Sequence, residues 1–266
     1  MPQAGLILCL ALLILTAGGP SAHAASATDA ASAPVNPAPE IIVTASRSDL
    51  LGKAQTASQG TISREEVELR PIYRTSQLFE SIPGLVATIH SGEGKAQQFL
   101  IRGYNLDHGT DFASFVDDMP VNRPTNAHGQ GYSDLNFLMP QIVSGIDYTK
   151  GPYYAYIGDF GPVASAQTRL INDLPLQGAV NVGTDDYQSL FGAGTIHLDG
   201  NQRVMVAAEF GHYNGPWHPG QNFHKVNAVI RYSQGSSIDG FSLTGMAYAS
   251  GGGLITDQAV ARSRKD

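Results

Sequence analysis

Alternation of apolar and polar side chains marks the C-terminal third of the sequence. It runs through residues 202–213, 223–233 and 241–250 and, more weakly, through residues 187–198. In residues 202–213, one face carries Val204, Val206, Ala208 and Phe210, and the other carries Arg203, Met205, Ala207 and Glu209. Because successive side chains of a strand point to opposite faces, the pattern predicts about four antiparallel strands.

The length of these strands helps to distinguish a soluble sheet from a membrane-crossing one. Strands of soluble proteins usually have about 5–6 residues, whereas strands that cross a membrane need about 9–11. Soluble antiparallel sheets also alternate, but segments of about ten residues with one apolar face and turns between them are typical of transmembrane β-barrels. We therefore predict that residues 178–266 form the first antiparallel strands of a transmembrane β-barrel.

The preceding residues have a different texture, with short helices and short strands. Ser63 and Glu66 have the spacing of a capping box, which predicts a helix over residues 63–69. A second helix is predicted over residues 75–82, where Pro83-Gly84 ends it. Strands are predicted at residues 85–89, 99–102, 113–117 and 142–148. We expect residues 47–177 to form an α+β domain.

The N-terminus has the pattern of an export signal. Residues 6–15 are apolar, and Ala22-His23-Ala24 gives the small-x-small pattern of a cleavage site. The apolar run is too short for a transmembrane helix of about 20 residues. We expect residues 1–24 to be a signal peptide; a buried helix of a cytosolic protein is the alternative. Residues 25–39, rich in Ala, Ser and Pro, predict a disordered linker.

A short β-prone segment follows the linker. It consists of Glu40, Ile41, Ile42, Val43, Thr44 and Ala45. A strand between disordered flanks suits pairing with the sheet edge of a partner protein. It also suits the first strand of the following domain, and the local pattern leaves both readings open.

Composition excludes several classes of function. The formal net charge is −7 and the cations are scattered, which argues against a nucleic-acid partner because such partners need clustered cations. The single cysteine, Cys9, lies in the predicted signal peptide, so the mature chain would have no disulfide and no cysteine metal site. No catalytic motif is present, and we expect neither an enzyme nor a cofactor.

Two segments of the α+β region gather side chains that can bind a ligand. The candidates are Tyr104, His108 and Asp111 in the first segment, and Asn126, His128 and Tyr132 in the second. Histidine nitrogen and carboxylate oxygen suit borderline metals such as Zn, Cu, Ni or Fe. The alternative is that these are polar loop residues that hydrogen-bond within the domain.

Five segments resemble, in order and spacing, the plug domain of TonB-dependent outer-membrane receptors. They are LFESIPGL at residues 78–85, FLIRGY at 99–104, FVDDMP at 115–120, VSGIDYTKGP at 143–152 and IGDFGPVASA at 157–166. Asp118 stands where the family usually has glycine, and Gly145 and Asp147 replace charged residues. The last segment matches loosely.

The resemblance implies a set of structural roles. A plug of this family lies inside a barrel of 22 strands, and its loops after the IRG and DGxP motifs face the ligand. It implies that residues 40–46 are a TonB box, which pairs with the periplasmic TonB protein. It also implies that Arg102 lies between plug and barrel beside carboxylates. The other plug residues with implied structural roles are Pro83, Gly84, Gly103, Asp117, Gly151 and Pro152.

The resemblance also implies a function. We expect a receptor in the outer membrane of a Gram-negative bacterium that takes up a scarce ligand, either a metal ion or a metal chelate. Its partners would be TonB, outer-membrane lipid and that ligand. Since only about four strands can be placed before the sequence ends, we expect an N-terminal fragment that is not competent alone. The alternatives are a non-transporting periplasmic binding module and a secreted all-β enzyme.

Overall fold

The computed structural model describes residues 53–89, 92–236 and 239–253. These residues fall within one compact unit. The predicted signal peptide, linker and TonB box lie outside the described residues.

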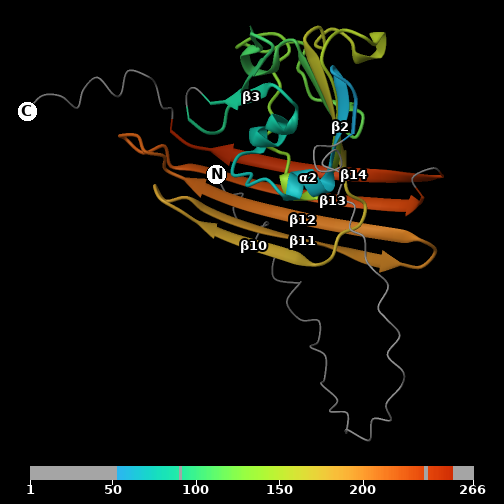
Figure 1. Ribbon diagram of the computed structural model, residues 1–266. Coiled ribbons are helices and arrows are strands. Elements are labelled where there is room, and N and C mark those ends of the chain that lie inside the picture. Colours follow the sequence, from blue (N-terminus) through green and yellow to red (C-terminus); the bar gives the residue numbers. More distant parts are fainter. Residues whose placement is uncertain (1–52, 90–91, 237–238, 254–266) are drawn as a thin grey trace, which may run out of the picture. The chain divides into compact units, whose positions relative to one another are not determined.

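An α+β part precedes a sheet of long strands (Figure 1). The helical turns of the α+β part are α2 (Arg64–Glu68), η1 (Thr75–Ser81), η2 (Asp107–Gly109), η3 (Pro140–Ile142) and η4 (Ala155–Ile157). Its strands are β1 (Lys53–Thr56), β2 (Gln59–Ser63), β3 (Leu85–Thr88), β4 (Gln98–Ile101), β5 (Tyr104–Asn105), β6 (Phe112–Val116), β7 (Met119–Pro120), β8 (Val143–Thr149) and β9 (Ala164–Leu170).

These strands form two sheets. The larger has six strands in the order β1-β2-β8-β9-β6-β7, and the smaller has the order β3-β4-β5. Most neighbours are antiparallel, but β6 and β9 run parallel, with Phe112 opposite Ala164. The chain between β6 and β9 carries β7, the second segment of candidate ligand residues (Asn126, His128 and Tyr132), η3, β8 and η4.

The core of the α+β part is built around three buried phenylalanines. Phe79 comes from η1, Phe99 from β4 and Phe112 from β6. Their ring centroids lie 4.9–5.9 Å apart, and edge-to-face contacts of this kind stabilise a core beyond the area that they bury. The cluster joins the two sheets and η1 into one hydrophobic core.

The predicted helices are confirmed in place, with one difference in type. Ser63 caps α2, where its hydroxyl accepts a hydrogen bond from the Glu66 amide at 3.3 Å. The second segment, Thr75–Ser81, is a 3-10 helix. The helix ends at Ser81, because Pro83 disfavours a helical conformation at Ile82, the residue that precedes it.

The predicted strands at residues 85–89, 99–102, 113–117 and 142–148 are confirmed as β3, β4, β6 and β8, within about a residue at each end. The pattern missed β9, which includes Ser165, Gln167 and Arg169. A strand with polar residues on one face and small residues on the other gives a weak apolar signal.

The second part is the long-strand sheet, β10 to β14. Its strands are β10 (Gln177–Val182), β11 (Gln188–Leu198), β12 (Gln202–Tyr213), β13 (Phe223–Gly235) and β14 (Gly240–Gly251). They lie side by side in chain order and pair antiparallel with unbroken registers (Figure 1). The sheet therefore has five strands, one more than predicted, because the short β10 was missed.

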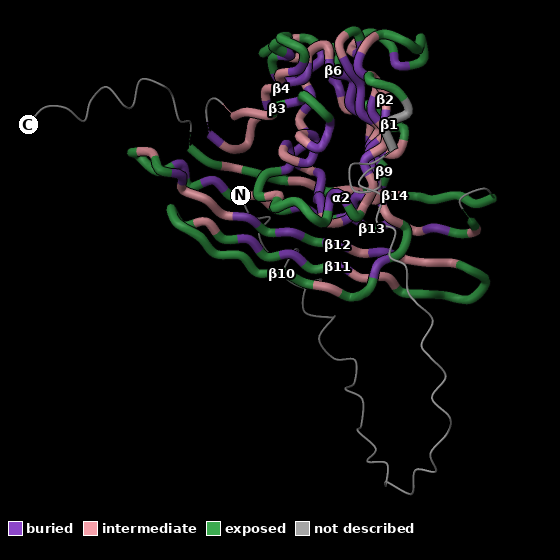
Figure 2. Tube along the Cα trace, in the orientation of Figure 1, coloured by how far each residue is buried: buried purple, intermediate pink, exposed green. Residues whose placement is uncertain are grey.

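The predicted faces of the long strands are confirmed. On β12, Met205, Ala207 and Glu209 are buried, whereas Phe210 is exposed. Figure 2 shows this alternation along β11, β12 and β13. The exposed face of the sheet is apolar: it carries Val180, Val182, Leu190, Ile196, Phe210, Ile230, Phe241 and Leu243. Among the described residues, no helix combines the length and apolar character that crossing a bilayer requires.

Candidate functional site

The two candidate loops follow β4 and β7 and lie against each other. The first runs through β5 and η2 to Asp111, and the second covers residues 121–133. The second loop closes on itself, since the Arg123 amide donates to the Tyr132 carbonyl at 3.0 Å. The Ser133 amide donates to the His108 carbonyl at 2.9 Å, which joins the two loops.

The loops bring two histidines into contact. The rings of His108 and His128 have centroids 4.4 Å apart with their planes at 76°. Ligand atoms of Asp107, His108 and His128 all lie within 4.8 Å of one another. We call these three residues the histidine cluster. His108 is buried, whereas Asp107 and His128 are exposed, so the cluster opens to solvent on one side.

A hydrogen bond to the backbone of Ala96 fixes the orientation of the His108 ring. Its Nδ1 lies 2.5 Å from the Ala96 carbonyl oxygen, and a carbonyl can only accept, so Nδ1 carries the proton in this hydrogen bond. In the neutral ring, Nε2 then holds the lone pair. Nε2 lies 3.7 Å from Oδ1 of Asp107.

Tyr132 supports the same arrangement. Its hydroxyl accepts a hydrogen bond from the Ala96 amide at 2.9 Å, and its ring lies 5.8 Å from that of His108 and 6.0 Å from that of His128. The Asn126 side chain accepts from the His128 amide at 2.8 Å, which shapes the turn that presents His128. Tyr132 and Asn126 therefore position the cluster rather than belong to it.

Two of the predicted ligand residues lie elsewhere. Asp111 has a left-handed φ of 63°, and its backbone carbonyl accepts from the amides of Val163 and Ala164 at 3.3 Å. It anchors the start of β9, and Asp107 is the carboxylate that meets the histidines instead. Tyr104 is exposed on β5 opposite Ile101.

The residue that organises both loops is one that the sequence did not single out. Asn122 is buried, and its Oδ1 accepts from the Ser114 amide at 2.7 Å. Its Nδ2 is directed at the carbonyls of Gly109, Phe112 and Gly131 at 2.9–3.1 Å. One side chain thus ties the end of η2 to β6 and to the second loop. No motif in the neighbouring sequence predicts this role.

A polar chain leads from the cluster to the long-strand sheet. Ala96 lies beside Gln97, whose Nε2 donates to Asn136 Oδ1 at 2.9 Å. The Asn136 carbonyl accepts from Asn227 Nδ2 at 3.1 Å, and Asn227 also donates to Glu209. Lys225 pairs with Glu209 at 3.0 Å. The buried face of β12 and β13 therefore makes polar contacts with the α+β part beside its buried apolar residues Met205, Ala207 and Val229.

A second set of contacts joins the two parts at Asp117. The Asp117 carboxylate accepts from the Leu170 amide at 3.0 Å and forms an ion pair with Arg231 of β13. Arg231 is buried and also donates to Asn172 at 2.7 Å. Asp117 therefore contacts both the end of β9 and the long-strand sheet.

The surroundings of Arg102 differ from the expectation. Its guanidinium donates to the Lys150 carbonyl at 3.0 Å and to Ser58 Oγ at 2.9 Å. In the part of the chain that the structure describes, no carboxylate pairs with it. Gly103 follows it with a φ of 83°, a conformation that favours glycine, so Arg102 holds the turn after β4 against the end of β8.

The remaining predicted plug residues surround Lys150. Its Nζ donates to the Pro83 carbonyl at 3.2 Å. Gly84 and Gly151 have φ angles of 81° and 126°, and Pro152 is exposed. Burial lowers the pKa of the Lys150 amine, and the positive charge of Arg102 lowers it further.

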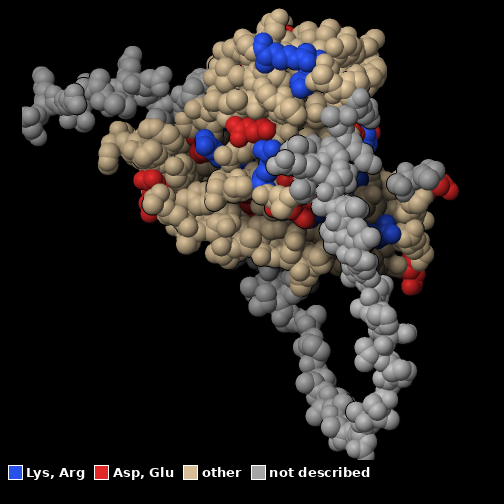
Figure 3. Space-filling model, viewed as in Figure 1, with Lys and Arg blue, Asp and Glu red and all other residues tan. Residues whose placement is uncertain are grey.

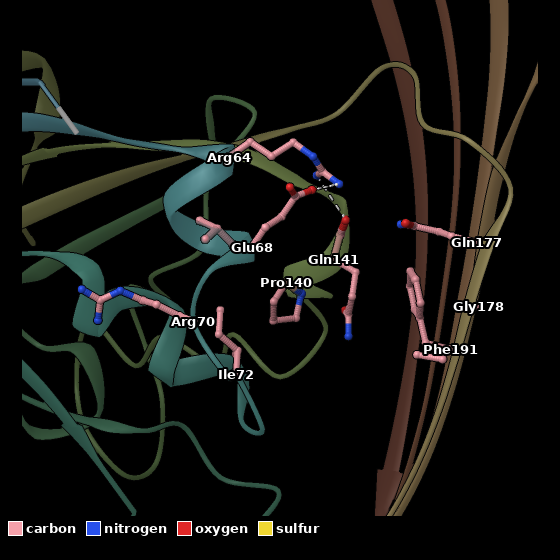
Figure 4. Close-up of a pocket in the computed structure, with 11 residues that line it drawn as sticks. Arg64, Glu68, Arg70, Ile72, Pro140, Gln141, Gln177, Gly178 and Phe191 are labelled. Carbon is pink, nitrogen blue, oxygen red and sulfur yellow. Dashed lines mark hydrogen bonds and ion pairs between the residues drawn. The ribbon is translucent and has the colours of Figure 1, made fainter. Parts of the chain in front are cut away.

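Several cavities lie between the α+β part and the long-strand sheet within the described residues, and two of them have volumes of about 300 and 460 Å³. One of about 300 Å³ separates α2 from β10 and β11. Figure 4 shows Arg64 in it, paired with Glu68 and donating to the Gln141 carbonyl. The other, of about 460 Å³, is lined by Tyr73, Tyr187, Tyr213 and Trp217. Neither is lined by a residue of the histidine cluster.

Comparison with known proteins gives a family and a fold. The family model described as TonB-dependent Receptor Plug Domain matches residues 52–165. The vitamin B12 transporter BtuB of Vibrio vulnificus (strain YJ016) is 24% identical over 153 residues, which cover 56% of this chain. The match covers 24% of that relative, so the chain spans about a quarter of its length.

Solved structures share the fold. The copper transporter OprC superposes with a TM-score of 0.56 at 12% identity, over 77% of this chain and 33% of that one. The siderophore receptor PiuA from Acinetobacter baumannii gives 0.53 at 18% identity, over 73% of this chain and 26% of that one. Residues 52–165 are therefore a plug domain of the TonB-dependent receptor family, and the antiparallel strands after them resemble the start of such a receptor's barrel.

Proposed function

We propose that this chain is part of an outer-membrane receptor that binds a scarce ligand and releases it inward in a TonB-dependent step. The observation that carries the proposal is the joining of a plug domain to long strands whose exposed face is apolar. The function is affinity and gated release, with no reaction catalysed.

The exposed face of the long-strand sheet supports the membrane setting. Val182 is 79% exposed and Leu243 is 71% exposed, and an apolar face of this extent would be costly in water. Figure 3 shows few charges over these strands on the face in view. The opposite face carries Glu209, Asn227 and Arg231, and of these Asn227 and Arg231 hydrogen-bond to the plug. Apolar outside and polar inside is the arrangement of an outer-membrane barrel.

The histidine cluster supports a metal ion or a metal chelate as the ligand. It lies in the loops after the IRG and DDMP segments, which the resemblance to the family implies face the ligand. Among proteins of the same fold are a copper transporter and siderophore receptors, as their names state. The metal preference of this chain rests on the cluster itself.

Energy for release would come through residues 40–46. In the proposed step, the segment from Glu40 to Ala45 pairs as a strand with periplasmic TonB, and tension on it remodels the plug. The β-prone run Ile41-Ile42-Val43 suits such pairing because strand addition depends on backbone hydrogen bonds.

The test is a proline substitution in a complete receptor that contains this chain. Val43→Pro removes a backbone donor and blocks strand pairing, whereas Val43→Thr keeps the donor and a β-branched side chain. We expect Val43→Pro to abolish uptake and leave ligand binding unchanged, and Val43→Thr to retain uptake. Full uptake by the proline variant would refute the role of this segment.

Fractionation tests the membrane setting separately. A chain that inserts through its long strands is extracted only by detergent. Release by osmotic shock would favour the periplasmic binding module instead.

A further inference from the structure

We propose that the histidine cluster is a binding site for a free borderline divalent cation, coordinated by Asp107, His108 and His128. This inference rests on the proposed function and deepens it, because it names the ligand as the ion itself and not a metal already enclosed by a chelator. Zn²⁺, Cu²⁺ and Ni²⁺ are the ions of this class that two imidazoles and a carboxylate suit.

The spacing of the three residues fits a site that closes on its ion. Bond lengths of about 2.0–2.2 Å to nitrogen and oxygen place tetrahedral ligand atoms about 3.3 Å apart. The cluster's atoms lie within 4.8 Å of one another, and His108 Nε2 is already 3.7 Å from Asp107 Oδ1. The movement needed to bring the ligand atoms to bonding distance falls on Asp107 and His128, whose side chains are exposed.

Hydrogen bonds behind the ligands prepare them for coordination. The bond from His108 Nδ1 to the Ala96 carbonyl selects the tautomer whose Nε2 lone pair can bind a metal. Metal-binding histidines commonly donate their other ring nitrogen to a carbonyl in this way. Asn105 Oδ1 accepts from the Asp107 amide at 3.2 Å, as Asn126 does from the His128 amide. An asparagine side chain therefore holds the backbone at Asp107 and at His128.

The number of ligands argues for exchange. Three protein ligands leave a fourth position of a tetrahedral ion open to water, unlike the four-ligand sites that hold zinc permanently. An ion held in this way can arrive hydrated and leave again. A metal enclosed by a chelator offers no positions for three side-chain ligands.

Charge supports the same class of ion. Ligands must be deprotonated to coordinate a metal, so two imidazoles and one carboxylate bound to the ion carry one negative charge, and a divalent ion with these ligands keeps one net positive charge. Mg²⁺ and Ca²⁺ prefer six or more oxygen ligands, so the two ring nitrogens select against them.

The test is titration of the purified full chain in detergent, stripped of metal by a chelator, with Zn²⁺ alone. Calorimetry is expected to give one site per chain. His128→Ala removes an exposed ligand with little effect on folding and is expected to weaken binding by about 100-fold or more, since even the loss of an outer hydrogen bond costs 10–100-fold. His224→Ala, an exposed histidine on β13, is the matched control and should bind like the parent.

A carboxylate pair gives a second comparison. Asp107→Asn is expected to weaken Zn²⁺ binding at least tenfold, whereas Asp111→Asn should leave it within about twofold, because Asp111 lies outside the cluster. Asparagine tolerates the left-handed backbone at residue 111, so the control is expected to fold.

The outcomes separate this inference from the proposed function. Absence of Zn²⁺, Cu²⁺ and Ni²⁺ binding, or binding that survives His128→Ala, overturns the cation site and leaves TonB-dependent uptake of another ligand standing. Binding lost in His128→Ala, together with uptake that Val43→Pro does not change, supports the site and overturns the proposed function. Equal effects of Asp107→Asn and Asp111→Asn also overturn the site.

Discussion

Asp117, at the turn between β6 and β7, forms an ion pair with Arg231 in the middle of β13. Asp117 and Asp118 both have left-handed φ angles, 46° and 67°, as a two-residue type I′ hairpin turn requires. The turn places the Asp117 carboxylate against the buried guanidinium. Arg231 also donates to Asn172 and Thr244. This one guanidinium of the long-strand sheet therefore donates to Asp117 and Asn172, which precede the sheet, and to Thr244 of β14.

Asp117→Asn should destabilise the folded chain. Asparagine keeps the left-handed turn and removes the charge that compensates Arg231. We expect a loss of about 2 to 3 kcal/mol, less than breaking a fully buried pair costs, because Asp117 is only partly buried. Urea unfolding of the chain in detergent measures it.

The neighbouring carboxylate is the control for that experiment. Asp118 is exposed and its side chain accepts from Gln167 at the surface. Asp118→Asn should change the free energy of unfolding by less than about 0.5 kcal/mol. Equal losses in the two variants would mean that the turn, and not the ion pair, determines the stability.

Asn122→Ala should loosen both candidate loops. The change leaves the buried Ser114 amide and three carbonyls without their side-chain partner, which we expect to cost about 3 kcal/mol. Asn126→Ala, which removes one hydrogen bond at a partly exposed turn, should cost less than about 1 kcal/mol. Amide hydrogen exchange should rise across residues 107–111 and 129–133 in the first variant only. Unchanged exchange there would contradict the organising role of Asn122.

Gln221→Leu should release the segment that leads to the cluster. The side-chain amide of the buried Gln221 bonds to the backbone of Glu93. Its Oε1 accepts from the Glu93 backbone N–H at 2.9 Å, and its Nε2 donates to the Glu93 backbone carbonyl at 2.8 Å. Leucine has similar size but makes neither bond, and the expected loss is about 1 to 3 kcal/mol. Hydrogen exchange at residues 92–97 should increase, whereas Gln234→Leu, at an exposed site on β13, should leave it unchanged.

Glu93 should make stability depend on pH. Burial raises the pKa of its carboxyl above the ordinary 4.5, although the charges of Arg74 and Lys225 act against the shift. Between the ordinary and the raised pKa the folded state binds more protons than the unfolded state, so stability falls as pH rises through that window. The penalty is complete above the raised pKa.

Glu93→Gln removes that penalty. The variant should melt at a higher temperature than the parent near neutral pH, and the difference should shrink as the pH falls toward about 4.5. Thermal unfolding at both pH values measures it. A difference that stays constant with pH would show that the carboxyl is not desolvated in the folded chain.

The sequence by itself determined the elements whose signal is local. Alternation along residues 202–213 assigned Phe210 and Glu209 to opposite faces, because the geometry of a strand allows no other outcome. Ser63 with Glu66 marked the start of α2 by a hydrogen bond that spans three residues. Spacing of the plug motifs gave the family before any contact was known.

Only the tertiary structure decided which distant groups meet. The sequence places both Asp107 and Asp111 close enough to His108 to be its partner. In the structure, the backbone carbonyl of Asp111 accepts hydrogen bonds at the start of β9, a strand more than 50 residues further along, and Asp107 is the residue beside His108. Asn122 gains its role because four backbone groups converge on it. Arg231 could be assigned to the inner face, but its pairing with Asp117 depends on how the plug packs against β13, and no local pattern encodes a contact between residues so far apart.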